Sequence, residues 1–123
     1  MTKIYVAAPF SSPTLAIVED RVRAVGDACA WLLAEGYLPM SPVAHWHVPA
    51  RRNDLPTQAL AWIEWNRAWL HASDALAVLC INGWQDSQGV GLEMKWAQEA
   101  GKPVWAVGVS GEGFFWKGGA EKY

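Results

Sequence analysis

The sequence predicts an α/β fold: a single-domain open parallel sheet of four to five strands with helices on both faces, of the Rossmann or flavodoxin type. Strand-like and helix-like segments alternate along the chain, as they do in parallel sheets with crossover helices. Residues 75–81, ALAVLCI, are a continuous apolar run, as expected of a central strand covered on both faces. With 123 residues, 52% of them hydrophobic, the chain suits one domain over 1–123 and is too apolar for intrinsic disorder. We expect the strand order 2-1-3-4.

Residues 3–8, KIYVAA, are β-branched and aromatic, and Pro9 ends them, so they predict the first strand. A helix is predicted from Pro13 onward because apolar residues recur at steps of three and four: Leu15, Val18, Val22, Val25, Cys29, Leu32 and Leu33. Gly36 is expected to close this helix as a C-terminal cap.

Residues 37–43, YLPMSPV, predict a second strand at an edge of the sheet, because Pro39 and Pro42 cannot donate ladder hydrogen bonds. Residues 44–55 mix charge, proline and histidine without a period, and predict a long loop of the kind that carries binding groups. A second helix is predicted to begin at Pro56, with one face formed by Leu60, Ile63, Arg67 and Leu70.

Residues 82–89, NGWQDSQG, predict a polar turn after the central strand, and a third helix follows over about 90–100. Gly101 and Pro103 separate this helix from a further buried strand over 104–109. The glycine-rich tail, 111–123, has no clear predicted structure.

Composition excludes several classes of protein. Ten basic against twelve acidic residues give a formal net charge of −2, without the basic excess of nucleic-acid-binding proteins. No run approaches the ~20 apolar residues of a membrane span, and the first residues enter a strand directly, so we expect a cytoplasmic protein. Cys29 and Cys80 lie in apolar stretches and are predicted to be buried thiols. Nine tryptophans are more than a small core holds, so some are expected to line a cleft or a subunit interface.

In a sheet of this topology, ligands bind beyond the carboxyl ends of the strands, where the winding reverses. Here that place lies between the first and third strands, so residues 9–12 and 82–91 are expected to meet there. The substrate contacts predicted from the first segment are Pro9, Phe10 and Ser11.

The second segment contains a polar, glycine-rich helix start. Ser87 can cap the helix, while Gly89 and Gly91 let a ligand approach the backbone. Glu93 follows in the first turn or so, where the helix dipole favours an ionised carboxylate, and a carboxylate at the floor of a cleft can act as a nucleophile. The same spacing also fits a structural role, in which Glu93 only completes a capping arrangement.

Three stretches together resemble the nucleoside 2-deoxyribosyltransferase-like family, which includes the 2′-deoxynucleoside 5′-monophosphate N-glycosidases. They are IYVAAPF at 4–10, Ser73-Asp74, and Gly83-Trp84 with SQGVGLE at 87–93, and they are most similar to a bacterial and phage branch of that family. The resemblance covers about 3–109, and 87–93 is its most specific part. It implies that Glu93 attacks the anomeric carbon of deoxyribose, that Tyr5 orients this carboxylate, and that Ser87 binds near the 5′ end of the substrate.

The sequence departs from the family pattern at one position. The resemblance implies an aspartate on the helix before the third strand, as the group that protonates the leaving base, and the corresponding residue is Asn66. An amide cannot deliver a proton at neutral pH. Either another acid substitutes, with Asp54, Asp86 and Glu64 as candidates, or Asn66 only hydrogen-bonds the base and catalysis is slow or absent.

Three further groups have a functional and a structural interpretation. His45 and His47 could ligate zinc, but no third ligand is evident, so no metal is predicted and both are interpreted as loop or base-contacting histidines, with His45 as the predicted substrate contact. Arg51 and Arg52 fit either a substrate phosphate or a solvated surface. One helix face is crowded by tryptophans, which indicates a subunit interface more than base stacking: Trp62, Trp65 and Trp69.

This resemblance implies an enzyme that cleaves or transfers the N-glycosidic bond of a deoxynucleoside or its 5′-monophosphate through a deoxyribosyl-Glu93 intermediate. No cofactor is expected. The chain is expected to form a homodimer or a higher oligomer. Ser87 is neutral and lies at a predicted helix N-terminus, which favours the 5′-monophosphate, whereas an aspartate there would repel it. The alternative is a catalytically inactive nucleotide-binding module.

Overall fold

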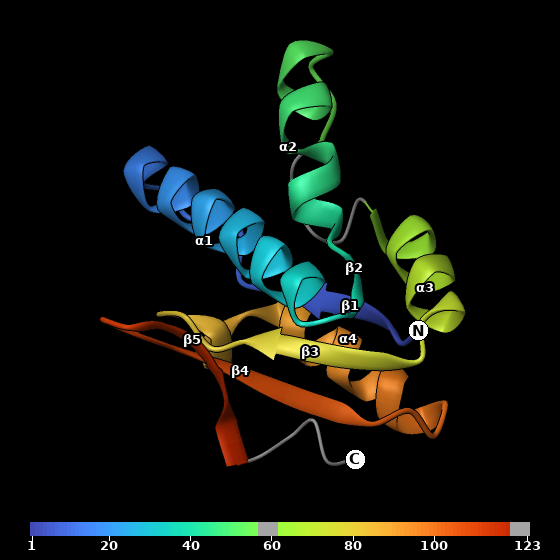
Figure 1. The fold of residues 1–123 in the computed structure, drawn as a ribbon. Coiled ribbons are helices and arrows are strands. Elements are labelled where there is room, and N and C mark those ends of the chain that lie inside the picture. The colour runs from blue at the N-terminus through green and yellow to red at the C-terminus, as the bar shows by residue number, and fades with distance from the viewer. Residues whose placement is uncertain (57–61, 119–123) are drawn as a thin grey trace.

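The computed structural model describes residues 1–56 and 62–118. In this part of the chain, strands β1 (Lys3–Ala7), β2 (Leu38–Met40), β3 (Ala75–Leu79), β4 (Val104–Ser110) and β5 (Gly113–Trp116) form one sheet in the order β2-β1-β3-β4-β5 (Figure 1). β2, β1, β3 and β4 are parallel, and β5 is antiparallel to β4. The predicted α/β class and the strand order 2-1-3-4 are confirmed.

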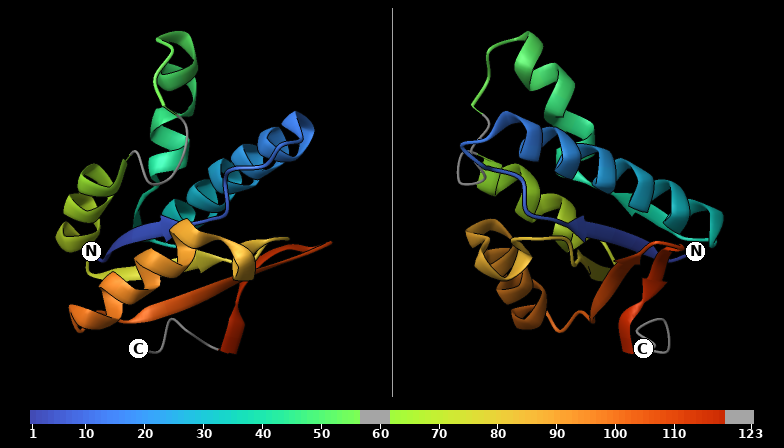
Figure 2. Two further views of the ribbon diagram at one scale, coloured as in Figure 1. Left: turned by 180° about the vertical axis from the view of Figure 1, so that it is seen from behind. Right: turned by 90° about the vertical axis from the view of Figure 1, so that its left-hand side faces the viewer.

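The two faces of the sheet carry separate cores. Figure 2 shows α1 (Leu15–Ala34) lying over one face of the sheet, and Ile4 and Val6 of β1 pack on this face with Val25, Ala28 and Leu32 of α1. Tyr5 and Ala7 alternate to the other face, where they join a cluster with residues of α3 (Ile63–Ala72) and α4 (Gln88–Glu99). The alternation in β1 therefore directs the Tyr5 side chain toward α4.

The predicted end of the first helix is confirmed. Gly36 has a φ of +94° and its N–H donates to the Leu33 carbonyl at 3.1 Å, while the Tyr37 N–H reaches back to the Leu32 carbonyl at 3.0 Å. This pair of bonds is a Schellman motif, which glycine permits at no steric cost. β2 follows at the edge of the sheet as expected, but it ends at Met40.

Residues 44–55 were expected to form a long loop, and this prediction is wrong. Most of them belong to α2 (Pro42–Arg52), which stands out from the sheet in Figure 1 and contacts α1. The Ser41 Oγ accepts a hydrogen bond from the Ala44 N–H at 3.1 Å, and Pro42 takes the first helical position, where its missing N–H costs nothing. This cap and proline start the helix in spite of Pro49 inside it.

Two further boundaries differ from expectation. Pro56 lies outside any helix and α3 begins at Ile63, while residues 57–61, including Leu60 of the expected face, lie outside the described residues. The tail had no clear predicted structure, yet residues 113–116 form β5. The aromatic side chains of this segment pack on the sheet and stabilise the strand in spite of the neighbouring glycines. The rings of Phe114 and Trp116 pack against Trp31, with centroids 5.9 and 5.4 Å apart.

Cys29 and Cys80 are free thiols, and both are half-buried rather than fully buried. Burial raises the pKa of Cys29 to about 11, so this thiol stays protonated. Among the described helices, none has the length and apolar content that crossing a bilayer requires.

Gly26 offers a test of the helix assignment. It lies exposed inside α1, and a methyl group there would meet nothing within 4 Å. Because alanine favours the helix more than glycine does, Gly26→Ala is expected to raise the free energy of unfolding by about 0.5–1 kcal/mol in urea denaturation. Gly36→Ala is the opposing control, since the left-handed backbone at a φ of +94° strains any side chain and is expected to lower stability. A loss of stability in Gly26→Ala would contradict this account of α1.

Candidate active site

A cavity of about 570 Å³ opens at the carboxyl ends of β1 and β3. The chain runs outward from β1 to β2 and then returns to build β3 on the other side of β1, so the cavity lies where open α/β sheets bind ligands. The predicted site residues that line it are Pro9, Phe10, Ser11, Asn66, Ser87, Gly89 and Glu93.

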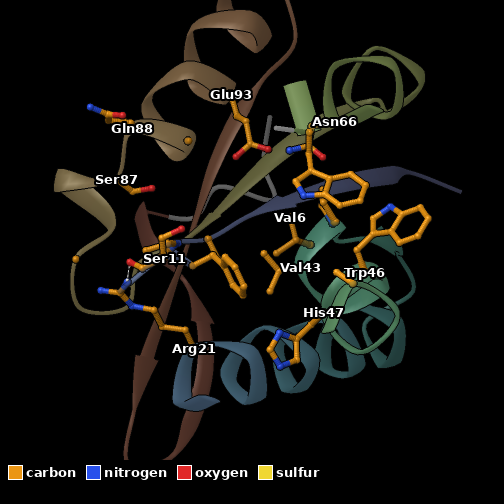
Figure 3. A pocket seen from close by; sticks show the side chains of 18 of the residues that line it. Val6, Ser11, Arg21, Val43, Trp46, His47, Asn66, Ser87, Gln88 and Glu93 are labelled. Carbon is orange, nitrogen blue, oxygen red and sulfur yellow. Dashed lines mark hydrogen bonds between the residues drawn. The ribbon is translucent and has the colours of Figure 1, made fainter. Parts of the chain in front are cut away.

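The start of α4 carries two of these groups. The Ser87 Oγ accepts a hydrogen bond from the Val90 N–H at 3.2 Å, so Ser87 is the helix cap, as predicted from the sequence. Glu93 lies in the second turn of α4 and is only 8% exposed. Its carboxylate points into the cavity in Figure 3, while the helix itself packs against the sheet.

Glu93 is held from below by Tyr5. The Tyr5 side chain is fully buried beneath the cavity, and its hydroxyl donates a hydrogen bond to Glu93 Oε2. This bond joins the middle of β1 to α4, which are separated by most of the chain. Tyr5 thus orients the carboxylate without lining the cavity itself.

Burial, rather than the helix dipole, decides the charge of Glu93. Desolvation raises the pKa of this carboxyl to about 7, and the hydrogen bond from Tyr5 only partly opposes the rise. The expectation that the dipole keeps Glu93 ionised is wrong in direction, because the residue lies beyond the first turn and away from solvent. Burial and the nearby Glu93 raise the pKa of Tyr5, so its hydroxyl remains a donor.

Asn66, from α3, faces Glu93 across the upper part of the cavity (Figure 3). Its Oδ1 is buried and makes no hydrogen bond within the described residues. Of the three acids considered as substitutes for it, only Asp86 lines the cavity, whereas Asp54 and Glu64 are exposed elsewhere. The position opposite Glu93 is thus occupied by an amide with an unused acceptor.

Arg21 of α1 is a cavity residue that the sequence analysis missed. Its Nη1 donates to the Ser11 carbonyl at 2.8 Å and its Nη2 to the Asn82 carbonyl at 3.2 Å, so it ties the loop after β1 to the loop after β3. Gly83, with a φ of +94°, leaves room for this guanidinium, which any Cβ there would strike. The signal was an arginine beside Val18, Val22 and Val25 in an otherwise apolar helix stripe.

The wall of the cavity formed by α2 was missed only in part. Trp46 and His47 line the cavity, and Trp62 stacks on Trp46 with ring centroids 5.1 Å apart. The Trp46 Nε1 and the His47 Nδ1 are buried without a hydrogen-bond partner among the described residues. Trp46 escaped notice because its segment was expected to be a loop, whereas His47 was considered with His45 but not chosen as the predicted base contact.

Several predicted contacts lie elsewhere. Gly91 is on the exposed side of α4, and His45 stacks on Trp65 at 5.5 Å, outside the cavity lining. His47 lines the cavity in its place and contacts the Phe10 ring edge-on. Arg51 borders a shallower neighbouring depression and lies 4.0 Å from Glu19 of α1, while Arg52 is exposed.

The tryptophans in α3, and Trp62 directly before it, pack partly against other residues of the chain. Trp62 and Trp65 are half-buried against Trp46 of α2, whereas Trp69 is 47% exposed. The exposed apolar surface of this helix face is therefore smaller than the sequence predicts.

Comparison with known proteins supports the fold. A family model, described as a domain of unknown function (DUF1937), matches residues 2–109. A solved structure of a 2-deoxyribosyltransferase from the psychrotolerant bacterium Bacillus psychrosaccharolyticus has a TM-score of 0.60 and 22% sequence identity, over 89% of this chain and 74% of that chain. No curated protein matches the sequence significantly. The expected likeness to the deoxyribosyltransferases is confirmed as a shared fold.

The buried carboxyl predicts an unusual stability profile. Because folding raises the pKa of Glu93 from 4.5 to about 7, the unfolded chain ionises first and the wild type loses stability as the pH rises through this interval. Glu93→Gln cannot ionise, so at pH 8 its free energy of unfolding is expected to exceed that of the wild type by roughly 2–3 kcal/mol.

Urea denaturation at pH 8 and pH 4 measures this difference, which is expected to vanish at the lower pH. Glu99→Gln, on the exposed surface of the same helix, is the matched control. Equal stability of wild type and Glu93→Gln at both pH values would show that Glu93 is not desolvated.

Proposed function

The chain belongs to the family of the DUF1937 domain, and we propose that it cleaves the N-glycosidic bond of a deoxynucleoside or its 5′-monophosphate through a covalent glycosyl-Glu93 intermediate. The observation that carries this proposal is the buried Glu93 carboxylate, fixed by the Tyr5 hydroxyl at the floor of a cavity. A carboxylate held in one orientation and shielded from water is the nucleophile that retaining glycoside cleavage requires.

The proposed reaction has two steps. A carboxylate oxygen of Glu93 attacks C1′ of the sugar, and the base departs with the electrons of the C1′–N bond. Water, or a second base in a transfer reaction, then attacks C1′ and releases the carboxylate. This chemistry also requires a carboxylate that keeps its orientation as its charge changes. The hydrogen bond from the Tyr5 hydroxyl to Glu93 meets this requirement.

The cavity suits a nucleotide in size and in lining. Its volume of about 570 Å³ is within the usual range for small-molecule sites. The aromatic side chains of Phe10, Trp46 and Trp62 offer stacking surfaces for a base. The capped start of α4 offers backbone N–H groups near Ser87 for a 5′-phosphate, and Arg21 brings a positive charge to the same cavity.

A catalytically inactive nucleotide-binding module is the second candidate, because Asn66 faces Glu93 where a proton donor would be expected. The homodimer or higher oligomer also stays a prediction, with the exposed Trp69 as its main support.

Release of free base distinguishes the two candidates. Incubation with a panel of 2′-deoxynucleoside 5′-monophosphates is expected to yield free base, with kcat/KM rising with pH up to about 7 as Glu93 ionises. Glu93→Gln is expected to lose roughly 10⁴-fold or more of this activity, and mass spectrometry of the quenched wild type to detect a deoxyribosyl adduct on Glu93. Binding of nucleotide without any base release, by wild type and variant alike, would favour the inactive module.

The preference for a phosphate is tested at Ser87. A 5′-monophosphate is expected to bind the wild type at least ~10-fold more tightly than its nucleoside, and Ser87→Asp is expected to abolish or reverse this preference by charge repulsion. Ser87→Asn keeps a capping side chain without the charge and is the matched control. Calorimetric titration measures all three, and an unchanged preference in Ser87→Asp would remove Ser87 from the phosphate site.

A further inference from the structure

The cavity contains few groups that could protonate a departing base. Its titratable side chains, among the described residues, are Arg21, His47, Asp86 and Glu93. Residues 57–61, which precede α3, read TQALA and contain no acid. Glu93 is assigned to the attack on the sugar, so the proton donor would have to be one of the remaining three.

None of these three is suited to that task. Arg21 is a permanent cation engaged with two carbonyl oxygens, and Asp86 adjoins Ser87, on the side proposed for the phosphate. His47 lies opposite Glu93 in Figure 3, with Val6 and Val43 between them. Its pKa is lowered by burial and then by the charge of Arg51, against a weaker opposite effect of Glu19, so the imidazole is neutral at pH 7.

The group beside Glu93 is instead the neutral amide of Asn66, whose Oδ1 can accept a hydrogen bond but supply no proton. A neutral purine or pyrimidine leaves as an anion unless it is protonated, and loss of a general acid typically costs 10²–10⁴-fold in rate. A base that already carries a positive charge leaves as a neutral molecule and needs no such donor.

The surroundings of the base favour a cation. Trp46 and Trp62 line the cavity, and tryptophan is the aromatic side chain that attracts cations most strongly. Among the described residues, neither ion pair involves Glu93, so its buried carboxylate has no positive partner. A cationic base above the sugar would supply the missing charge and favour the ionised nucleophile.

We propose that the substrates of this site are N-glycosides whose base is positively charged on its ring before cleavage, such as N7-alkylated purine or pyridinium deoxynucleotides. This inference rests on the proposed role of Glu93. The Glu93 carboxylate forms a bond to C1′, and the C1′–N bond breaks with its electron pair passing to the ring nitrogen, which loses its positive charge. Water then attacks C1′, the ester bond returns its electrons to Glu93, and the proton of the water passes to solvent.

The experiment compares N7-methyl-2′-deoxyguanosine 5′-monophosphate with unmethylated 2′-deoxyguanosine 5′-monophosphate. Chromatography measures release of the base, and Glu93→Gln gives the spontaneous rate to subtract. The wild type is expected to cleave the methylated nucleotide with a kcat/KM at least ~100-fold higher. Because the methylated bond is also weaker in water, the preference alone is not decisive.

Asn66→Asp supplies the decisive comparison. This variant has nearly the same shape and adds a proton donor, so it is expected to raise kcat/KM for the unmethylated nucleotide by roughly 100-fold, with a decline at high pH, and not to raise it for the methylated one. Asn66→Ala opens the same space without an acid and is expected to show no such gain.

The outcomes separate this inference from the proposed function. Similar kcat/KM values for both nucleotides in the wild type, or a methylated-to-unmethylated ratio that Asn66→Asp leaves unchanged, would overturn the charge requirement while the role of Glu93 stands. Failure of the wild type and Asn66→Asp to release base from either nucleotide would overturn both.

Discussion

The hydrogen bond from Tyr5 to Glu93 is the interaction on which the candidate site depends. It requires β1 to present its third residue, Tyr5, to the α4 face, and it requires α4 to begin close enough to the sheet for its second turn to lie over that strand. The order β2-β1-β3-β4, with α4 crossing between β3 and β4, meets both requirements. A carboxyl group buried in this way is costly to ionise, and the single hydroxyl offsets only part of that cost.

Local patterns were enough to predict the sheet and the three helices that cover it. Period and capping identified α1, and the apolar run over 75–81 identified β3, because strands and helices of a buried core are dictated by near neighbours. The pattern failed for α2 and β5, whose stability comes from tertiary contact. α2 is more polar than α1, α3 and α4 and contains Pro49, yet Ser41 caps it and α1 supports it. β5 is stabilised at the edge of the sheet by the packing of its aromatic rings on Trp31.

The candidate site was predictable where it follows a helix start and unpredictable where it is assembled across the chain. Ser87 and Glu93 lie within one stretch of seven residues at a helix start, so their spacing could be recognised in the sequence. Arg21, Trp46 and His47 reach the cavity from α1 and α2, and only the folded arrangement brings them to the carboxyl ends of β1 and β3. The charge of Glu93 was misjudged for the same reason, since desolvation depends on every layer packed above the residue.

Because of the position of α2, the floor and one wall of the cavity belong to different parts of the fold. The floor, with Tyr5 and Glu93, is part of the sheet core, whereas Trp46 and His47 lie on α2, a helix that stands out from the sheet in Figure 1 and packs against α1. We therefore expect local opening of α2 to cost less free energy than opening of the floor. Movements or substitutions in α2 can therefore change ligand entry and base selection while the position of the Glu93 carboxylate stays the same. The reacting group and the residues that select the base thus belong to separate parts of one small chain.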